Sequence, residues 1–130
     1  MKKLILALLF VVSSVVTHAQ HVYDIETVSY IVWENKKWIV KESNNPQNMT
    51  ITTYSDIAII DDRNKTIYRM DRESETINYP THKVVQWKAH DNDGKECMFV
   101  VKRTYDPESM IILTLYDGTP MYGFEYILKN

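Results

Sequence analysis

Few residues in this chain of 130 could carry out chemistry on a substrate. Beyond the first 20 residues it has three histidines, His21, His82 and His90, and none is spaced as a metal-binding pair. We expect His90, on the polar side of an alternating segment, to be solvated. Cys97 is the only cysteine, so it cannot form a disulfide within one chain. We expect it to be a small buried hydrophobic residue, with an intermolecular disulfide or a reactive thiol as alternatives.

The acidic residues form no complete catalytic or metal-binding motif. The run from Asp91 to Gly94 (Asp-Asn-Asp-Gly) resembles the start of a calcium loop, but it lacks the remaining spacing of an EF-hand. We interpret it as a hairpin turn, with an ion site as the alternative. The three glycines all lie in the last hairpins, so no phosphate loop or dinucleotide fingerprint is present. The sequence therefore predicts no catalytic residues, no metal and no cofactor, and favours a protein that is not an enzyme.

Aromatic residues are the unusual feature of the composition, with nine Tyr, three Trp and three Phe. They lie mainly on predicted strands, where they would fill a small β core that no disulfide supports. The alternative is that some of them line a cavity or an interaction surface. The candidate ligand-binding residues on this second interpretation are Trp33, Trp38, Trp87 and Phe99.

A first hairpin is predicted around the turn at 34–37. Closing it symmetrically places Trp33 opposite Trp38, and the same face would then carry Ser29 and Glu42. An aromatic pair beside polar groups suits the wall of a ligand site. It is equally the pattern of an ordinary cross-strand pair.

The stretch from Lys83 to Leu128 predicts four antiparallel strands joined by three turns. Residues 83–90 alternate between apolar and polar, as in a strand with one buried face. If Gly94 closes a bulged hairpin, Trp87 lies opposite Phe99 on the next strand. A two-residue loop would shift the register by one residue, and we favour the bulged form.

The last two turns are predicted at 106–109, with Pro107 in the second position, and at 117–120. Pairing across the second of them predicts one apolar face and one more polar face. The apolar face would comprise Ile111, Leu113, Leu115, Tyr122, Phe124 and Tyr126, and the opposite face Thr114, Gly123 and Glu125.

Shorter strands are predicted at 49–54, 57–60, 66–70 and 76–79, with a charged loop at 71–75. The chain thus has eight to nine strands, with turn signals every eight to twelve residues. This spacing predicts an all-β, single-domain antiparallel meander that forms a barrel, with a β-sandwich as the alternative.

The first 19 residues have the pattern of a cleaved signal peptide. Lys2 and Lys3 precede an unbroken apolar run, and a small residue, Ala19, ends the segment. Cleavage there leaves an all-β domain at 20–130, exported to the periplasm or the extracellular space. Loss of the two lysines leaves 13 basic and 17 acidic residues, a net charge of −4. We expect no nucleic-acid partner and no membrane span in the mature chain.

The features that carry a resemblance to a known family are a signal peptide, an early strand with Trp33 and a meander from Val22 to Leu128. In these features the chain resembles the small exported bacterial β-barrel proteins of the lipocalin-like or calycin kind. The Gly-x-Trp motif of lipocalins is missing, because Ile31 and Val32 precede Trp33. Exported β proteins of this size also occur in families of unknown function. The resemblance implies a domain that binds a small apolar ligand or a partner protein through a barrel mouth or a sheet face. The alternative is a structural or assembly protein whose exposed strand edge pairs with another chain.

Overall fold

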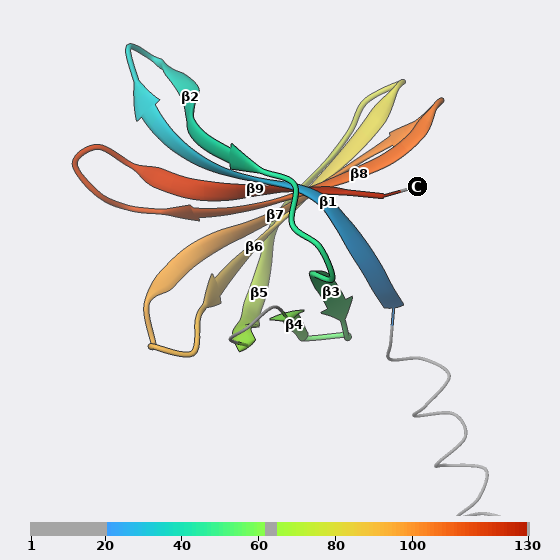
Figure 1. The fold of residues 1–130 in the computed structure, drawn as a ribbon, viewed down its shortest axis with the longest axis horizontal. Coiled ribbons are helices and arrows are strands. Elements are labelled where there is room, and N and C mark those ends of the chain that lie inside the picture. The colour runs from blue at the N-terminus through green and yellow to red at the C-terminus, as the bar shows by residue number, and fades with distance from the viewer. Residues whose placement is uncertain (1–20, 62–64, 130) are drawn as a thin grey trace, which may run out of the picture.

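The computed structural model of the chain describes residues 21–61 and 65–129, so the predicted signal peptide and its cleavage site lie outside the described residues. Nine strands and no helix are present in this part of the chain (Figure 1). The strands are β1 His21–Glu34, β2 Lys37–Asn44, β3 Thr50–Thr53, β4 Ile57–Asp61, β5 Lys65–Asn78, β6 His82–His90, β7 Glu96–Tyr105, β8 Glu108–Tyr116 and β9 Tyr122–Leu128.

Eight of the strands close into an antiparallel barrel, in the order β1-β3-β4-β5-β6-β7-β8-β9, with β9 paired back to β1. The ninth strand, β2, pairs only with β1. Closure is possible because β1 is long: 21–24 pair with β3 and 25–32 with β9, while 28–34 also pair with β2. The prediction of an all-β barrel is therefore confirmed.

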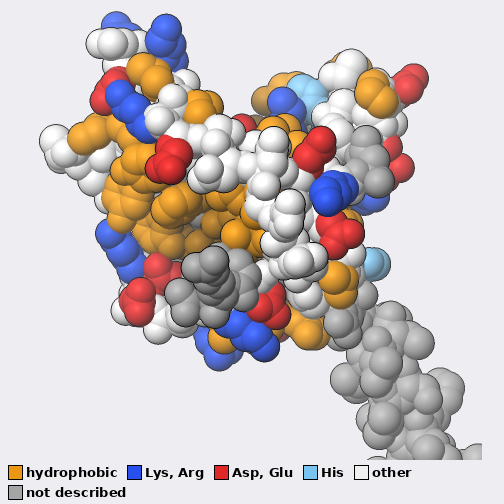
Figure 2. Space-filling model, viewed as in Figure 1, with side chains coloured by type: hydrophobic (Ala, Val, Ile, Leu, Met, Phe, Trp, Pro, Cys, Tyr) orange, Lys and Arg blue, Asp and Glu red, His pale blue; other side chains and the backbone are white. Residues whose placement is uncertain are grey.

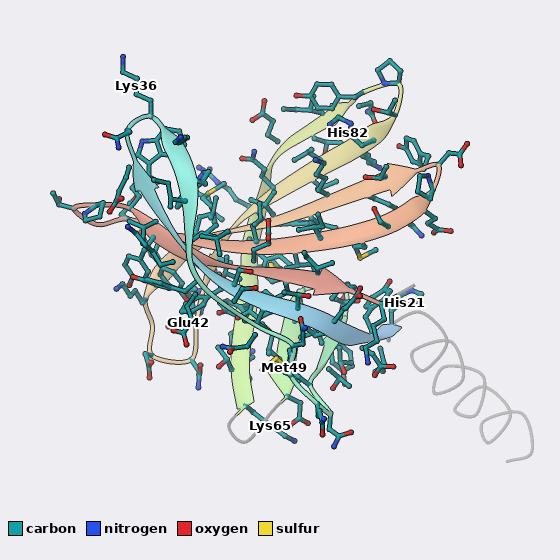
Figure 3. All side chains as sticks on the ribbon, turned by 45° about the horizontal axis from the view of Figure 1, so that its top comes forward. His21, Lys36, Glu42, Met49, Lys65 and His82 are labelled. Carbon is teal, nitrogen blue, oxygen red and sulfur yellow. The ribbon has the colours of Figure 1, made fainter. Side chains whose placement is uncertain are left out.

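The hairpins alternate between the two ends of the barrel. The β1–β2, β6–β7 and β8–β9 hairpins fan out on one side of Figure 1, and the β7–β8 hairpin and the C-terminus lie on the other. Figure 3 shows the same separation, with Lys36 at the tip of one arm and His82 on another. We refer to these as the β8–β9 end and the β7–β8 end.

Next to their turns, two hairpins have the predicted register because the turn residues determine it. Asn35 and Lys36 both have positive φ, 53° and 63°, as a two-residue type I′ turn requires, and Trp33 lies opposite Trp38. Gly94 has φ 78° and closes the bulged turn between β6 and β7. The bulged register is confirmed, and Trp87 pairs with Phe99 on β7.

The predicted position of Glu42 is wrong. A bulge in the β1–β2 ladder between Tyr30 and Ile31 shifts the pairing, so that Ser43 lies opposite Ser29. The two hydroxyl oxygens are 3.1 Å apart. Glu42 lies opposite Tyr30 and hence on the other face of the sheet from Trp33.

The predicted face of the last hairpin is also wrong. The connection between β8 and β9 has five residues rather than four, so Tyr116 pairs with Tyr122 and Thr114 with Phe124. A slip of one residue moves every side chain to the opposite face. Consequently Ile112, Thr114 and Tyr116 point inward with Tyr122, Phe124 and Tyr126, while Ile111, Leu113 and Leu115 share the outer face with Gly123 and Glu125.

Two local predictions also fail. The charged stretch 71–75 is part of β5 and not a loop; two bulges interrupt its pairing with β6. Beyond Arg69, β5 has no pairing with β4, so charged residues at this edge remain in contact with water. In the β7–β8 turn, Tyr105 pairs with Glu108, and Pro107 therefore takes the third turn position.

The middle of the barrel is filled by side chains. Five residues from four strands are almost completely buried and form what we call the plug: Ile25, Ile51, Phe99, Ile112 and Thr114. An eight-stranded barrel has an interior just wide enough for its own side chains. The plug therefore separates the space at one end of the barrel from the space at the other.

Candidate ligand-binding site

The four predicted ligand-binding residues form two pairs on opposite faces of the sheet. Trp87 and Phe99 point into the barrel, with ring centroids 6.3 Å apart, and Phe99 belongs to the plug. Trp33 and Trp38 lie on the outer face of the β1–β2 hairpin, in edge-to-face contact at 5.4 Å, and Trp33 is 40% exposed. The sheet itself separates the pairs, and a role of either in binding stays a prediction.

A different aromatic group lines the inner face at the β8–β9 end. The Tyr30 ring lies 5.6 Å from Phe124 and 6.3 Å from Tyr122, and Tyr122 stacks on Tyr116 at 5.3 Å. We call these four residues the aromatic mouth. Tyr30 is 36% exposed, and Tyr122 and Phe124 are partly exposed. Figure 2 shows hydrophobic side chains gathered in a hollow below the β1–β2 hairpin, on the side of the molecule where this end lies.

Charged groups from the β6–β7 hairpin contact the two stacked tyrosines of the aromatic mouth. Asp91 accepts a hydrogen bond of 3.0 Å from the Tyr116 hydroxyl and others from the backbone N–H groups of Asp93 and Lys95. The Lys95 ammonium donates to the Tyr122 hydroxyl and lies 4.9 Å from the centre of that ring and 5.3 Å from that of Tyr116. The carboxylate of Asp91 thus accepts the backbone hydrogen bonds of the turn that follows it, in agreement with the hairpin interpretation of residues 91–94.

The protonation states of these groups follow from their surroundings. Burial, the neighbouring hydroxyl of Tyr68 and the hydrogen bond to Asp91 all raise the pKa of Tyr116. Burial also favours a higher pKa for Asp91, but its hydrogen bonds from Lys95, Tyr116 and Asp93 outweigh that effect and lower it. The hydrogen bond to Tyr122 raises the pKa of Lys95. None of the three therefore changes its charge near neutral pH.

Cys97 lies on the inner face close to this cluster. It is 7% exposed, and the prediction that it is buried is confirmed. Burial, with the nearby charge of Asp91, raises the pKa of the thiol to about 11. The thiol is therefore protonated at neutral pH, which is the unreactive form.

The β7–β8 end has a pocket of its own, with a volume of about 310 Å³. Tyr23, Met110 and Leu128 supply its apolar surface. Arg103 and Lys129 supply positive charge, and Glu108 lies 3.0 Å from the Arg103 guanidinium. The pocket thus combines a hydrophobic surface with a basic rim.

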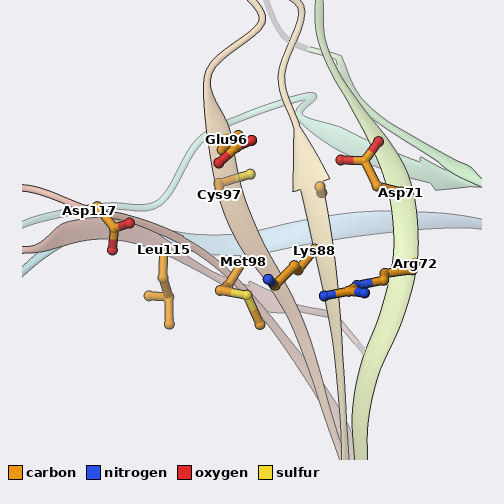
Figure 4. A pocket seen from close by; sticks show the side chains of 9 residues that line it. Asp71, Arg72, Lys88, Glu96, Cys97, Met98, Leu115 and Asp117 are labelled. Carbon is orange, nitrogen blue, oxygen red and sulfur yellow. The ribbon is translucent and has the colours of Figure 1, made fainter.

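A second pocket, of about 300 Å³, is lined by residues of β5, β6, β7 and β8, including the buried Cys97 (Figure 4). Its charged lining has both signs, with Arg72 and Lys88 near Asp71, and Met98 and Leu115 form its apolar part. Asp71 is already engaged, since its carboxylate lies 2.9 Å from the His90 ring nitrogen. The mixture of charges selects no particular class of ligand.

Sequence reasoning did not select the residues of the aromatic mouth. The alternation of Tyr122, Phe124 and Tyr126 did place these three on one face, but the wrong register joined them to the wrong residues of β8. Tyr30 is marked in the same way, because the apolar Val32 follows it two residues later, on the same face of a strand. The position of Lys95 beside Tyr122 has no signal in the sequence, because it depends on how two hairpins meet.

Comparison with protein-family models, with curated proteins and with solved structures finds no significant match to this chain. The barrel is thus established by the structure alone, and no comparison supports a lipocalin or calycin relationship. Within residues 21–61 and 65–129, no helix is long and apolar enough to cross a lipid bilayer.

Proposed function

We propose that this chain is an exported, non-enzymatic binding protein that takes up a small apolar ligand in the aromatic mouth. The observation that carries the proposal is the exposure of three aromatic side chains, Tyr30, Tyr122 and Phe124, on the inner face of the barrel. Inner-face aromatic residues of a barrel are normally covered by other side chains. Here they remain in contact with solvent at an open end.

The chemistry of the mouth supports binding more than proton transfer. Aromatic rings present large apolar surfaces with few degrees of freedom, which favours contact with a flat or hydrophobic ligand. The polar groups beside the rings are Lys95 and Asp91. Both keep the same charge throughout the range near neutral pH, and both are already hydrogen-bonded. Such groups orient a ligand, whereas a general acid or base needs a pKa near the working pH.

Export and the lipocalin-like character belong to the same proposal. Export rests on the signal-peptide pattern of the first 19 residues. The likeness to lipocalins rests on the eight-stranded barrel with exposed aromatic residues at one open end, a location that small barrels use for binding.

The test uses two exposed aromatic residues on opposite faces of the same strand. The neutral fluorescent probe N-phenyl-1-naphthylamine is titrated into the chain 20–130 and into its Tyr30→Ala and Trp33→Ala variants. Tyr30 is 36% exposed and Trp33 40%, so the substitutions remove similar exposed aromatic groups. We expect Tyr30→Ala to weaken binding at least fivefold and Trp33→Ala to change it less than twofold.

Unfolding midpoints of both variants show that each remains folded at the temperature of the titration. Absence of probe binding by the wild-type chain contradicts the proposal. Equal weakening by the two substitutions also contradicts it, because a site in the mouth contacts only the inner face.

A second candidate function is assembly through the edge of β2. This strand pairs with β1 alone, and its other edge has no strand partner among the described residues. Val40 is 54% exposed on it. An unpaired edge can accept a strand from another chain, although Lys37 and Lys41 are residues that often protect such edges.

Sedimentation of the chain 20–130 over a hundredfold range of concentration tests assembly between copies. Assembly predicts a mass that rises with concentration, and a rise that Val40→Lys reduces. A constant monomer mass removes pairing between copies from consideration.

A further inference from the structure

We propose that the β7–β8 end of the barrel is a second site, which binds an amphiphile with a short alkyl chain and an anionic head group such as a carboxylate. The proposal concerns side chains other than those of the aromatic mouth. It is therefore independent of the function proposed above, and the two can fail separately.

The first observation is a pair of cations opposite each other on the inner face. Lys83 on β6 pairs with Arg103 on β7. Both belong to the inner series of their strands, which continues through Val85 and Val101 to Trp87 and Phe99. Like charges at directly opposed positions destabilise a sheet, so the pair has an unfavourable interaction that an anion between them would relieve.

The second observation is the shortage of negative charge around this pair. Lys83 is partly buried and has no ion pair within the described part of the chain. Arg103 has one partner, Glu108, and the side chains of both are more than half exposed, so their interaction is screened by water. Lys129 adds a third positive group to the rim.

The third observation is the apolar surface beside these charges. Tyr23, Met110 and Leu128 line the same pocket as Arg103, and all three face the hydrophobic core. Its volume of about 310 Å³ is at the lower end for ligand sites, which run from about 300 to 1,000 Å³. A short alkyl chain therefore suits it better than a long one.

The arrangement determines the orientation of the ligand. Met110 and Leu128 face the hydrophobic core, so an alkyl chain lies on them while its head group stays near the open end. There Arg103, which lines the pocket, and Lys83, which lies opposite Arg103 on β6, supply N–H donors to the anionic oxygens. Arg103 can bind a carboxylate through two parallel hydrogen bonds.

Decanoate, decanol and decyltrimethylammonium share one alkyl chain and differ in head-group charge. Each is titrated into the chain 20–130 and followed by calorimetry, with the two ionic compounds below their critical micelle concentrations and decanol below its solubility limit. The variants are Lys83→Gln and Arg103→Gln, with Lys102→Gln as the matched control. Lys102 is next to Arg103 but lies on the outer face, so the control removes the same charge from the other side of β7.

We expect decanoate to bind at least tenfold more tightly than decanol, and the cationic analogue not to bind. Lys83→Gln and Arg103→Gln should each weaken decanoate at least fivefold, and Lys102→Gln less than twofold. Equal affinity for decanoate and decanol, equal weakening by Lys102→Gln, or no binding of decanoate overturns the proposal. Loss of decanoate binding in Tyr30→Ala also overturns it, because the ligand would then occupy the aromatic mouth.

Discussion

The two ends of this barrel are built by the same strands but present different chemistry. At the β8–β9 end, the inner positions of β1 and β9 carry Tyr30, Tyr122 and Phe124, which form a continuous aromatic surface. At the β7–β8 end, the inner positions of β6 and β7 carry Lys83 and Arg103. One β-strand can thus contribute a hydrophobic core residue in its middle and a candidate binding residue near its end.

The plug makes this difference between the ends possible. Its five residues are almost completely buried in the middle of the barrel, so the two ends are separate candidate sites rather than parts of one channel. Substitutions in the plug should therefore change the free energy of unfolding, whereas substitutions at either end should mainly change binding. The predictions below test that division.

The largest effect is expected for Phe99→Ala. Phe99 is 2% exposed and contacts Tyr68 and Trp87, so its loss leaves a cavity in the middle of the barrel. We expect the free energy of unfolding to fall by about 3–5 kcal/mol in a urea titration. A loss of less than about 0.5 kcal/mol, as for surface residues, would contradict the plug.

Gly123→Ala should have the next largest effect on the free energy of unfolding. Gly123 lies between Tyr122 and Phe124, and a Cβ there would collide with the Thr114 carbonyl oxygen and lie 2.9 Å from Leu115 Cδ2. Since β8 and β9 must then separate, we expect a loss of about 1–3 kcal/mol in the same titration, and weaker probe binding at the aromatic mouth. Unchanged stability would show that the two strands do not pack as described.

The tryptophan pair on the outer face should contribute less. A double-mutant cycle with Trp33→Ala and Trp38→Ala should give a coupling free energy of about 0.5–1.5 kcal/mol, typical of an edge-to-face aromatic pair. Ligand binding at both ends should be unaffected, since the pair lies on the other face of the sheet. A coupling near zero, or loss of probe binding in either variant, would argue against this placement.

Substitution of Asp91 should have the smallest effect on the free energy of unfolding, and this effect should depend on pH. Its pKa is lowered in the folded state from an ordinary value of 3.8, so its contribution to stability is fully present above that value. The contribution is lost as the pH falls below 3.8 and through the lower folded pKa. Because the carboxylate is partly exposed, we expect about 1 kcal/mol or less.

Unfolding titrations of the wild type and Asp91→Asn at pH 7 and pH 3 measure this difference. Asp91→Asn should be less stable than the wild type at pH 7, and the gap should narrow at pH 3. A gap that stays constant with pH would mean that the charge of Asp91 does not stabilise the hairpin.

The sequence predicted those parts of the fold that local residues determine. The positive φ values of Asn35, Lys36 and Gly94 belong to tight turns, and next to both turns the strands pair in the predicted register. The five-residue connection between β8 and β9 has no such signature, and the prediction there was wrong by one residue. The bulge beside Tyr30 was missed for the same reason, because no glycine marks it in the sequence.

The candidate sites were harder to predict than the fold. Trp33, Trp38, Trp87 and Phe99 were chosen as large aromatic residues, but the sheet divides them between its two faces. The aromatic mouth depends on the pairing of β1 with β9, which are almost a hundred positions apart in the chain. The pairing of Lys83 with Arg103 was implicit in the predicted β6–β7 register, yet its importance depends on the open end beside it.

The most direct test of two separate sites is binding of one ligand in the presence of the other. The affinity for N-phenyl-1-naphthylamine is measured on the chain 20–130 without decanoate and with decanoate at a saturating concentration. The plug separates the two ends, so we predict that the dissociation constant for the probe changes less than twofold. Displacement of the probe by decanoate, with an apparent dissociation constant that rises in proportion to decanoate concentration, would show a single shared site and contradict this account.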